Sequence, residues 1–430
     1  MVAFPTVQVS ELVAAGEAEL KTGPFGTQLK ASEYTDGGTP VINVRNIGMG
    51  QIRADKLEFI SDATRDRLVS HVLRAGDIVF GRKGAVERHV FIRKEQDGWF
   101  QGSDCLRLRF KSPRVEPLFA SYFFATEEHQ RWMMNQCSHG ATMASLNQEV
   151  LARIALPLPE VAVQRRIAGI LSAYDELIEN SQRRIRILET MARALYREWF
   201  VHFRFPGHEN VQRVDSALGE VPKDWEITDL RNVCIAGQGI QTGPFGSQLH
   251  EADYSDEGIP VIMPKDLIGF RIRTEGIARI PERTAEALGR HRMRPGDIVY
   301  GRRGDIGRRA FLMKHQTGWF CGTGCLRIRP DPQAVNGWYL FNYLGQDDVL
   351  SLIAGRAQGV TMPNLNTGVM SSVPVKLPPR SLQDKFARLT FPLAEARESL
   401  TFQIQALRRT RDLLLPRLLS GDLRLGARAA

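Results

Sequence analysis

The chain has 430 residues and a formal net charge of +9 at neutral pH. Hydrophobic residues make up 43% and charged residues 24%, a balance typical of folded globular proteins, so long disordered stretches are not expected. The positive charge favours a polyanionic partner. The five cysteines form no C-x-x-C pair, which argues against a zinc ribbon or a disulfide framework.

The N-terminal residues lack the basic start and the apolar run of a signal peptide. No stretch reaches the ~18 consecutive apolar residues of a membrane span. We therefore expect a soluble, cytoplasmic protein with no membrane partner.

The sequence contains a long internal repeat. Three blocks recur at an offset of 220 residues: Thr22–Leu29 as Thr242–Leu249, Arg74–Gly84 as Arg294–Gly304, and Gly98–Arg109 as Gly318–Arg329. A fourth block recurs at an offset of 219 residues, Gly140–Asn147 as Gly359–Asn366. A period this long does not fit a solenoid. The repeat predicts a duplicated domain and a two-fold pseudosymmetric molecule.

The first part of each copy is rich in glycine, proline and β-branched residues. In the first copy, short runs bounded by turn residues predict strands at residues 40–44, 77–80, 89–92 and 105–110. A helix is predicted over Pro117–Asn135, where Phe119, Phe123 and Trp132 suggest a buried stripe. These elements predict a mixed α/β globule with curled sheets.

The second part of each copy predicts a long amphipathic helix. Apolar residues recur at steps of three or four, the pattern of a coiled-coil seam. These positions are Ile167, Ile170, Tyr174, Leu177, Ile185, Leu188, Leu195 and Trp199 in the first copy, and Leu382, Phe386, Leu389, Leu393, Leu400, Ile404, Leu407, Leu414 and Leu418 in the second. Pro392 is expected to break or kink the second helix. Polar Ser181 falls on the first seam, and Arg411 lies near the second.

The predicted fold class is α+β. Two homologous mixed α/β domains are expected to be joined by two long antiparallel coiled-coil helices, with pseudo-two-fold symmetry. A helix of roughly 40 residues at ~1.5 Å per residue would be about 60 Å long and could form a rigid bar. The expected boundaries are 1–157 for the first domain, 158–204 for the central helix, 205–222 for a linker, 223–377 for the second domain and 378–426 for the C-terminal helix.

The motifs of a self-contained enzyme are missing from the sequence. A methyltransferase of this size would need an Asn-Pro-Pro-aromatic or Asp-Pro-Pro-aromatic motif, and the nearest string is Asp331-Pro332-Gln333. The glycine-rich strings at 81–84 and 301–307 lack the Lys-Ser/Thr ending of a P-loop and an acidic partner for a dinucleotide. We predict no catalytic residue, no metal site and no cofactor bound by this chain.

Two recurring polar positions fit a structural role better than a catalytic one. His71 and His291 could act as bases, but no nucleophile or carboxylate recurs beside them. A structural or phosphate-facing role is therefore favoured for both. Asp77 and Asp297 follow glycine at a strand entry, as turn residues do.

Recurring cysteines and aromatic residues also have two interpretations. Cys325 matches Cys105, and both it and Cys321 fit core thiols. The aromatic pairs could stack on a flipped base, although such residues more often plug a sheet. They are Trp99, Phe100, Trp319 and Phe320.

Basic and amide side chains on predicted loops form the candidate DNA-binding set. A neighbouring glycine removes steric bulk, which lets arginine or lysine approach a phosphate or guanine. Glutamine and asparagine can read adenine. The set is Gln28, Lys30, Arg45, Arg82, Lys83, Asn147, Gln248, His250, Lys265, Arg302, Arg303 and Asn366. The alternative is that these are solvated hairpin tips and side-chain-to-backbone hydrogen bonds.

The order of these motifs resembles the specificity subunit of type I restriction–modification systems. The matching pieces are the Gly-Pro-Phe-Gly-[Ser/Thr] loop, the Gly-Asp-Ile strand, the Gly-x-Thr-Met-x-x-Leu-Asn segment and a Pro-x-x-x-x-Gln-x-x-Ile helix start. The second helix start keeps proline and Gln383 but has Phe386 in place of isoleucine. Leu218–Trp225 resembles the family's entry into the second domain, and Leu414–Leu423 its C-terminal ending. The resemblance covers nearly the whole chain.

The resemblance implies two target recognition domains, each reading one half of a split DNA site. The helices would act as a ruler and dock two modification subunits, which carry S-adenosylmethionine and the catalytic motifs. Restriction subunits would add translocation and cleavage with ATP and Mg, and on DNA the protein would be nucleoid-associated. Kinship of the two copies predicts related half-sites. The implied docking residues are Gln164, Ile167, Leu171, Gln383, Phe386 and Leu414.

Two other functions stay open at this point. A stand-alone double-headed DNA-binding regulator or architectural protein would use the same readers without catalytic partners. Co-purification with a catalytic subunit separates it from a specificity subunit. A scaffold built on the helices would bind no duplex DNA, whatever the salt concentration.

Overall fold

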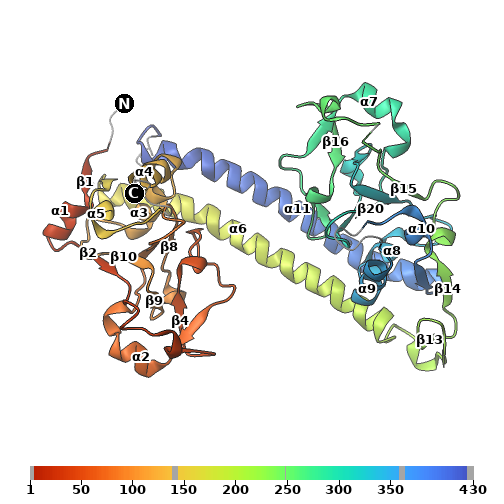
Figure 1. Cartoon of the computed structure of the whole chain (residues 1–430), viewed down its shortest axis with the longest axis horizontal. Coiled ribbons are helices and arrows are strands. Elements are labelled where there is room, and N and C mark those ends of the chain that lie inside the picture. Colours follow the sequence, from red (N-terminus) through yellow and green to blue (C-terminus); the bar gives the residue numbers. More distant parts are fainter. Residues whose placement is uncertain (1–3, 138–143, 247, 358–363, 424–430) are drawn as a thin grey trace, which may run out of the picture. The chain divides into compact units, whose positions relative to one another are not determined.

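The computed structural model describes residues 4–137, 144–246, 248–357 and 364–423. The chain forms two compact units: unit 1 comprises Met1–Arg183 and Leu400–Ala430, and unit 2 comprises Arg184–Ser399. Both divisions fall within long helices, α6 (Val161–Tyr196) and α11 (Arg380–Leu419). Each unit therefore contains one globular copy of the repeat and part of each helix (Figure 1).

The globule of unit 1 contains two main sheets (Figure 1). Their strand orders are β2-β10-β7-β8-β5 and β3-β6-β4-β9, and a separate pair joins β1 to β11. The strands are β1 (Thr6–Gln8), β2 (Ala18–Thr22), β3 (Tyr34–Thr35), β4 (Thr39–Ile42), β5 (Met49–Gly50), β6 (Glu58–Ile60), β7 (Ile78–Gly81), β8 (His89–Phe91), β9 (Phe100–Gln101), β10 (Cys105–Phe110) and β11 (Ala155–Pro157). The four strands predicted from the sequence are thus confirmed as β4, β7, β8 and β10.

Short helices complete this globule. They are α1 (Val9–Ala14), α2 (Asp62–Arg67), α3 (Pro117–Phe124), α4 (Glu127–Cys137) and α5 (Gln148–Ala152). The single helix predicted over Pro117–Asn135 is wrong, because the chain breaks between α3 and α4. Thr126 causes the break by capping the new helix: its hydroxyl accepts the backbone N–H of His129 at 3.3 Å.

The globule of unit 2 repeats this plan. Its main sheets have the orders β15-β23-β20-β21 and β19-β16-β22, with the pairs β14-β24, β17-β18 and β12-β13 beside them. The strands are β12 (Arg213–Val214), β13 (Val221–Pro222), β14 (Glu226–Asp229), β15 (Ile240–Thr242), β16 (Ile259–Ile262), β17 (Leu267–Ile268), β18 (Arg271–Ile272), β19 (Ala278–Ile280), β20 (Ile298–Gly301), β21 (Arg309–Phe311), β22 (Phe320–Cys321), β23 (Cys325–Ile328) and β24 (Pro374–Leu377). The helices are α7 (Glu282–Ala287), α8 (Gly337–Tyr343), α9 (Asp347–Arg356) and α10 (Thr367–Ser371).

The central strands β7 and β20 are buried on both faces, which explains their unbroken apolar sequences. Side chains alternate across a strand. Ile78 and Phe80 accordingly pack in one core cluster, whereas Val79 packs in another. Unit 2 repeats the alternation, with Tyr300 and Val299 in separate clusters. The central sheet of each globule therefore has a core cluster on each of its two faces.

The two long helices run antiparallel within each unit. In unit 1, Asp175 of α6 pairs with Arg411 of α11 at 2.5 Å. Towards the start of α6, Leu171 packs in one apolar cluster with Leu418 near the end of α11. In unit 2, the rings of Tyr196 and Phe386 lie 5.7 Å apart. The predicted long helices and their antiparallel pairing are thus confirmed within each unit.

Helix α11 continues through Pro392 from Arg380 to Leu419, so the predicted break is wrong. Proline removes one helical hydrogen bond and crowds the preceding turn. Core residues hold the helix on both sides of this point: Phe386 and Thr390 are fully buried before it, and Ala394 is buried after it. Tertiary packing therefore outweighs the local preference.

Candidate nucleic-acid interface

Four loop segments of unit 1 meet at one place. They are the Thr22–Leu29 loop after β2, the turn at 81–84 after β7, the turn at 102–104 before β10, and residues 145–147 before α5. Backbone hydrogen bonds join them: Arg82 N donates to Asp104 O at 2.8 Å, Leu146 N to Arg82 O at 2.8 Å, and Gly23 N to Cys105 O at 2.9 Å. We call this group the loop cluster of unit 1.

Unit 2 builds the same loop cluster from the second copy of each block. Arg302 N donates to Gly324 O, and Leu365 N donates to Arg302 O, both at 2.9 Å. Gly243 N donates to Cys325 O at 2.9 Å. The blocks that recur in the sequence therefore come together in space, once in each unit.

Glycine is required where the first loop passes the turn before β10. A Cβ atom on Gly23 would lie 1.9 Å from the carbonyl oxygen of Gly102, and one on Gly243 would lie 1.9 Å from that of Gly322. No real Cβ contact is that short, so any side chain here would displace the loop. This explains why the Gly-Pro-Phe-Gly sequence begins with glycine in both copies.

Gln28 and Gln248 were predicted to read bases, but each holds its own loop together. The Gln28 side-chain oxygen accepts the backbone N–H of Phe25 at 3.2 Å, and that of Gln248 accepts the N–H of Phe245 at 3.3 Å. Arg290 also donates to the Gln248 oxygen at 3.2 Å. Bidentate adenine recognition needs both the amide oxygen and the amide nitrogen. The local bond therefore competes with the predicted role.

Asn147 and Asn366 cap helices. Their side-chain oxygens accept the backbone N–H groups of Val150 and Val369, at 2.9 and 2.8 Å. This is the N-cap arrangement, which satisfies N–H groups that a helix start leaves unpaired. The structural alternative given with the sequence prediction holds for these two oxygens. The earlier half of each motif, residues 140–143 and 359–362, lies outside the described residues.

The equivalent arginines Arg82 and Arg302 differ in their surroundings. Arg82 is half-buried, and its side chain has no hydrogen-bond or ionic partner within the described chain. Arg302 is 7% exposed, and its Nε donates to Leu365 O at 2.8 Å and to Asn364 at 3.1 Å. Its guanidinium carbon lies 5.9 Å from the ring of Phe245. Arg302 therefore supports its loop, and this bond competes with its predicted contact to DNA.

The neighbouring cations are more accessible. Lys83 and Arg303 are exposed, and Lys83 has Asp104 within 3.3 Å. A solvent-exposed pair of this kind contributes little to stability, so Lys83 can exchange its carboxylate for a phosphate. Both residues belong to the turn that hydrogen-bonds to the other segments of the cluster. These exposed cations are consistent with a phosphate contact.

The remaining predicted DNA-binding residues lie in matched pairs on short helical turns. Lys30 and His250 each begin a 3₁₀ turn, and both are exposed. Arg45 and Lys265 are exposed within equivalent turns, and Arg45 pairs with Glu58 at 2.8 Å. Of the whole predicted set, nine side chains are exposed, Arg82 and Asn366 are half-buried, and Arg302 is buried.

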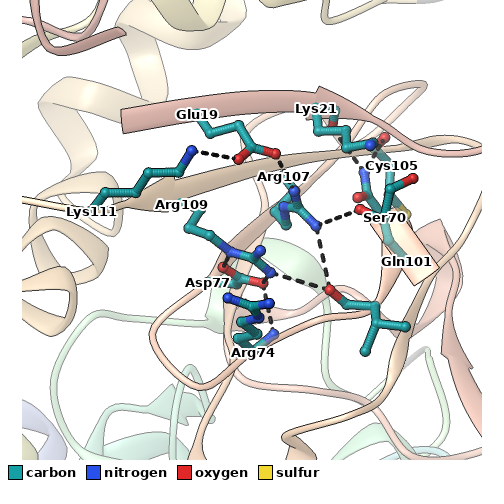
Figure 2. Close-up of polar contacts among 11 residues, drawn as sticks. Glu19, Lys21, Ser70, Arg74, Asp77, Gln101, Cys105, Arg107, Arg109 and Lys111 are labelled. Atoms are coloured by element: carbon teal, nitrogen blue, oxygen red, sulfur yellow. Dashed lines mark hydrogen bonds and ion pairs between the residues drawn. The ribbon is translucent and has the colours of Figure 1, made fainter. Parts of the chain in front are cut away.

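A network of charged residues joins strands β2 and β10 to the 70–77 segment of unit 1 (Figure 2). Arg109 donates two hydrogen bonds to the Asp77 carboxylate, both at 2.6 Å. Arg107, whose side chain is 1% exposed, pairs with Glu19 at 2.6 Å and donates to Ser70 O at 3.1 Å. Both arginines come from one face of β10, since side chains alternate along a strand. They fix the 70–77 segment to the sheet.

Asp77 also accepts the backbone N–H of Arg74 at 2.8 Å, which closes the turn before β7. Asp297 does the same for Arg294 at 2.8 Å. The predicted turn role is therefore confirmed. The ion pairs with Arg109 and Arg329 were not predicted, although the Arg-x-Arg pattern on one strand face indicates two neighbouring cations.

The recurring histidines are interior residues. His71 is 6% and His291 is 3% exposed, and each ring packs near a buried phenylalanine, Phe100 or Phe320. Burial disfavours the charged imidazole and lowers the pKa of each to about 4. Both rings are therefore neutral at physiological pH, which excludes a charge-based phosphate contact and favours the structural role.

The other residues with two interpretations also lie in the interior. All five cysteines are free and buried, and burial raises the pKa of the Cys321 thiol to about 12. Phe100 and Phe320 are fully buried. Trp99 and Trp319 pack against core clusters. Plugging of the sheets is therefore favoured over stacking on a flipped base.

The implied docking residues are mostly internal. Gln164 is fully buried; its side-chain oxygen accepts Glu116 N at 2.8 Å, and its nitrogen donates to Pro159 O at 2.7 Å. Gln383 repeats this with Asn336 N and Pro378 O, at 2.8 and 2.7 Å. Ile167, Leu171 and Phe386 are also buried, whereas Leu414 is half-buried. These glutamines join each globule to its helix, which corrects their assignment as a docking surface.

The described part of the chain contains neither a candidate metal site nor a candidate membrane-spanning helix. No group of three or more histidine, cysteine, aspartate or glutamate residues within it could hold a metal ion. None of its helices is long and apolar enough to cross a membrane.

Most of the chain, including both loop clusters, is similar to known proteins. A family model, the type I restriction modification DNA specificity domain, matches residues 19–190 and 222–406. The chain is 27% identical over 305 residues to the type I restriction enzyme MjaIX specificity subunit of Methanocaldococcus jannaschii, covering 71% of this chain and 68% of that protein. It is 20% identical over 409 residues to the HindI specificity subunit of Haemophilus influenzae, covering 82% and 87%.

A solved structure shows the same fold. The S subunit of a type I restriction–modification system from M. genitalium superposes with a TM-score of 0.64, at 16% identity over 97% of this chain and 96% of that one. The family model includes both loop clusters and most of both long helices. The chain therefore belongs to the type I restriction–modification DNA specificity family. This membership favours a specificity subunit over the stand-alone regulator that the sequence left open.

Proposed function

We propose that this chain is the sequence-reading subunit of a type I restriction–modification complex and catalyses no reaction itself. The observation that carries the proposal is the duplicated loop cluster, in which exposed cations and amides occupy matching positions in the two units. Lys83 and Arg303 supply phosphate contacts, which position a protein on DNA without specifying sequence. Two readers on one chain imply a bipartite site.

Similar loop architecture predicts related half-sites. Both clusters use the same glycine approach, the same glutamine bond and the same asparagine cap. Sequence differences then lie in the exposed side chains around this shared frame. A motif with two related halves would support this extension, and two unrelated halves would count against it.

The catalytic partners would be two methyltransferase subunits that bring S-adenosylmethionine, and restriction subunits that use ATP and Mg. Exposed apolar side chains on the long helices offer docking positions in place of the buried set. A large apolar side chain on a helix surface is a common contact for a partner helix. These residues, each more than two-fifths exposed, are Leu177, Ile187, Met191, Leu389 and Leu413.

The first experiment maps DNA methylation in a host that expresses this chain with its methyltransferase subunit. We expect one bipartite methylated motif, and no such motif when the methyltransferase subunit is expressed alone. Co-purification of the two subunits is expected as well. Tight DNA binding by this chain without any association with the methyltransferase would instead support a stand-alone regulator.

A second experiment tests whether the helices set the spacing of the half-sites. Four residues inserted before Ser181 lengthen α6 by about 6 Å, or roughly two base pairs at ~3.4 Å each. A matched insertion after Gln405 preserves pairing, because five residues separate each insertion point from the Asp175–Arg411 ion pair. We expect the methylated motif to gain about two base pairs of spacer.

The control places the same four residues beside Gly219, an exposed position between the two domains in sequence. That insertion leaves both helices unchanged, so the spacer should stay constant. An unchanged spacer in the doubly inserted helix variant would refute the ruler while leaving DNA recognition intact.

A further inference from the structure

Each loop cluster exposes an aromatic ring. Phe25 is 59% and Phe245 is 55% exposed, and the two residues occupy the same position in the repeat. Scattered exposed hydrophobic residues are normal on protein surfaces. An exposed phenylalanine at the same point of two diverged copies, however, needs an explanation that applies to both.

The loop around each ring is held from both sides. Phe25 O accepts the backbone N–H groups of Gln28 and Leu29 at 2.7 and 3.1 Å, while Phe25 N donates to the Gln28 side chain. Phe245 makes the same three bonds with Gln248 and Leu249. Both backbone polar groups of each phenylalanine are therefore satisfied within the loop.

Anchors lie on either side of this clamp. Leu29 and Leu249 are 3% and 4% exposed, so the end of each loop is fixed in the interior. The beginning of each loop lies close against a turn, Gly23 at the turn before β10 and Gly243 at the turn before β23. A rigid loop loses little conformational entropy when a ligand binds its side chain. The exposed ring is therefore already in position before a ligand binds.

The surroundings of the rings suit a polyanion with flat apolar faces. The guanidinium of Arg302 lies 5.9 Å from the Phe245 ring. The exposed cations Lys83 and Arg303 belong to the same loop clusters. An apolar protein partner that covered a ring would face the cost of desolvating these charges. DNA instead offers phosphates to the cations and a base face to the ring.

We propose that Phe25 and Phe245 each pack against a base within the half-site that their own domain reads. Gln28 and Gln248 then position the rings and are not the primary base readers. This inference rests on the proposed function and assigns specific contacts within it. It also gives the exposed rings a role that core packing does not supply.

The test uses the complete complex with its methyltransferase subunits and duplex DNA carrying the mapped motif. Phe25→Ala should weaken binding by roughly 10- to 100-fold, the range expected for losing one base–aromatic contact. Phe25→Tyr, which keeps the ring, should stay within about threefold of the unmodified protein by the same reasoning. Phe245→Ala should have the corresponding effect through the other half-site.

Three further measurements make the result specific. On a duplex whose first half-site is scrambled, Phe25→Ala should bind like the unmodified complex. The salt dependence of binding should be unchanged, because a phenyl ring releases no counterions. The matched controls Met49→Ala and Ile268→Ala, 45% and 41% exposed on β5 and β17, should bind normally.

The outcomes separate this inference from the proposed function. Failure of the unmodified complex to prefer any bipartite site would refute the proposed function. Normal binding by both alanine variants, with the unmodified complex specific, would refute only the contact assigned to the rings. Loss of the methyltransferase subunits from the alanine variants during purification would show that the rings face protein, which also overturns the inference.

Discussion

The two globules share one buried ion pair and differ at another buried polar position of the central sheet. The Asp77–Arg109 pair of unit 1 and the Asp297–Arg329 pair of unit 2 have nearly the same geometry, with contacts of 2.6 and 2.7 Å. By contrast, Arg309 of unit 2 occupies the position of His89 in unit 1. Divergence has thus spared this ion pair but not every polar residue around it.

The equivalent residues His89 and Arg309 have different neighbours in the two units. His89 lies 2.9 Å from the Ser121 hydroxyl, whereas Arg309 lies over the rings of Phe270 and Phe341 at 4.8 and 5.1 Å. Gly345 leaves room for the guanidinium, since a Cβ there would lie 1.3 Å from its Nη2. Close packing couples such changes, because one larger side chain needs several compensating ones.

The largest predicted effect tests the shared part of the comparison. Asp77→Asn and Asp297→Asn each leave a largely buried arginine without its counter-charge, which should cost about 3–5 kcal/mol of unfolding free energy. Urea denaturation followed by hydrogen exchange in each unit measures the loss. The two variants should be similarly destabilised. A clear difference between them would show that the two networks are not equivalent.

The next prediction tests the difference at His89. Burial lowers the pKa of His89 to about 4, that of His71 to about 4 and that of His129 to about 3, all in unit 1. In unit 2, burial lowers the pKa of His291 to about 4. Unit 1 should therefore be the more acid-sensitive unit.

The sign follows from proton binding. Between the ordinary histidine pKa of ~6.5 and about 4, the unfolded chain binds a proton that the folded chain does not. The contribution of these neutral rings to folding stability is fully present above pH ~6.5 and is lost as the pH falls towards about 4. At pH 5 the loss for His89 alone is about 2 kcal/mol. Hydrogen exchange at pH 7 and pH 5 should show unit 1 opening first, and equal loss of protection would contradict this.

Local patterns carried most of the fold prediction. Alternating or continuous apolar runs gave β7 and β10, and three-four periodicity gave α6 and α11, because those signals come from neighbouring residues. The repeat offset also indicated which blocks occupy equivalent positions. Pro392 misled the prediction, because the packing of Phe386, Thr390 and Ala394 cannot be seen in the helix sequence itself.

The sequence predicted which loops form the candidate site, but not what each side chain in them contacts. Arg82 and Arg302 look equivalent in sequence, yet Arg302 is held by Asn364, where the first copy has the shorter Ser145. The backbone N–H groups that donate to Gln164 and Gln383 lie 48 and 47 residues away. Such distant contacts have no local signature. Phe25 was visible inside its loop, but its exposure was not.

A smaller effect is expected from the helix caps. Asn147→Ala and Asn366→Ala each remove an N-cap, which should cost about 1 kcal/mol of unfolding free energy. Asn→Asp at either position keeps a capping oxygen and should be close to the unmodified protein in thermal melting. Neither alanine variant should change the methylated motif. An altered base at one position of the motif would instead make that asparagine a reader.

The smallest effect concerns Glu19, where the two units use different acceptors for one buried arginine. Arg107 pairs with the Glu19 carboxylate at 2.6 Å, whereas the equivalent Arg327 donates to the Gln241 amide oxygen at 2.9 Å and to Gln238 O at 2.8 Å. Glu19→Gln should therefore be tolerated, with a loss of about 1 kcal/mol on exchanging a charged acceptor for a neutral one. Partial exposure of Glu19 limits the loss further.

The pH dependence of this variant distinguishes lost charge from lost packing. A hydrogen bond from Lys111 and the charges of Arg107 and Lys111 lower the pKa of Glu19. Its contribution is therefore complete above the ordinary glutamate pKa and disappears as the pH falls through the lowered value. The stability difference between the unmodified protein and Glu19→Gln should shrink over that interval. A constant difference would mean that amide packing, and not charge, separates the two acceptors.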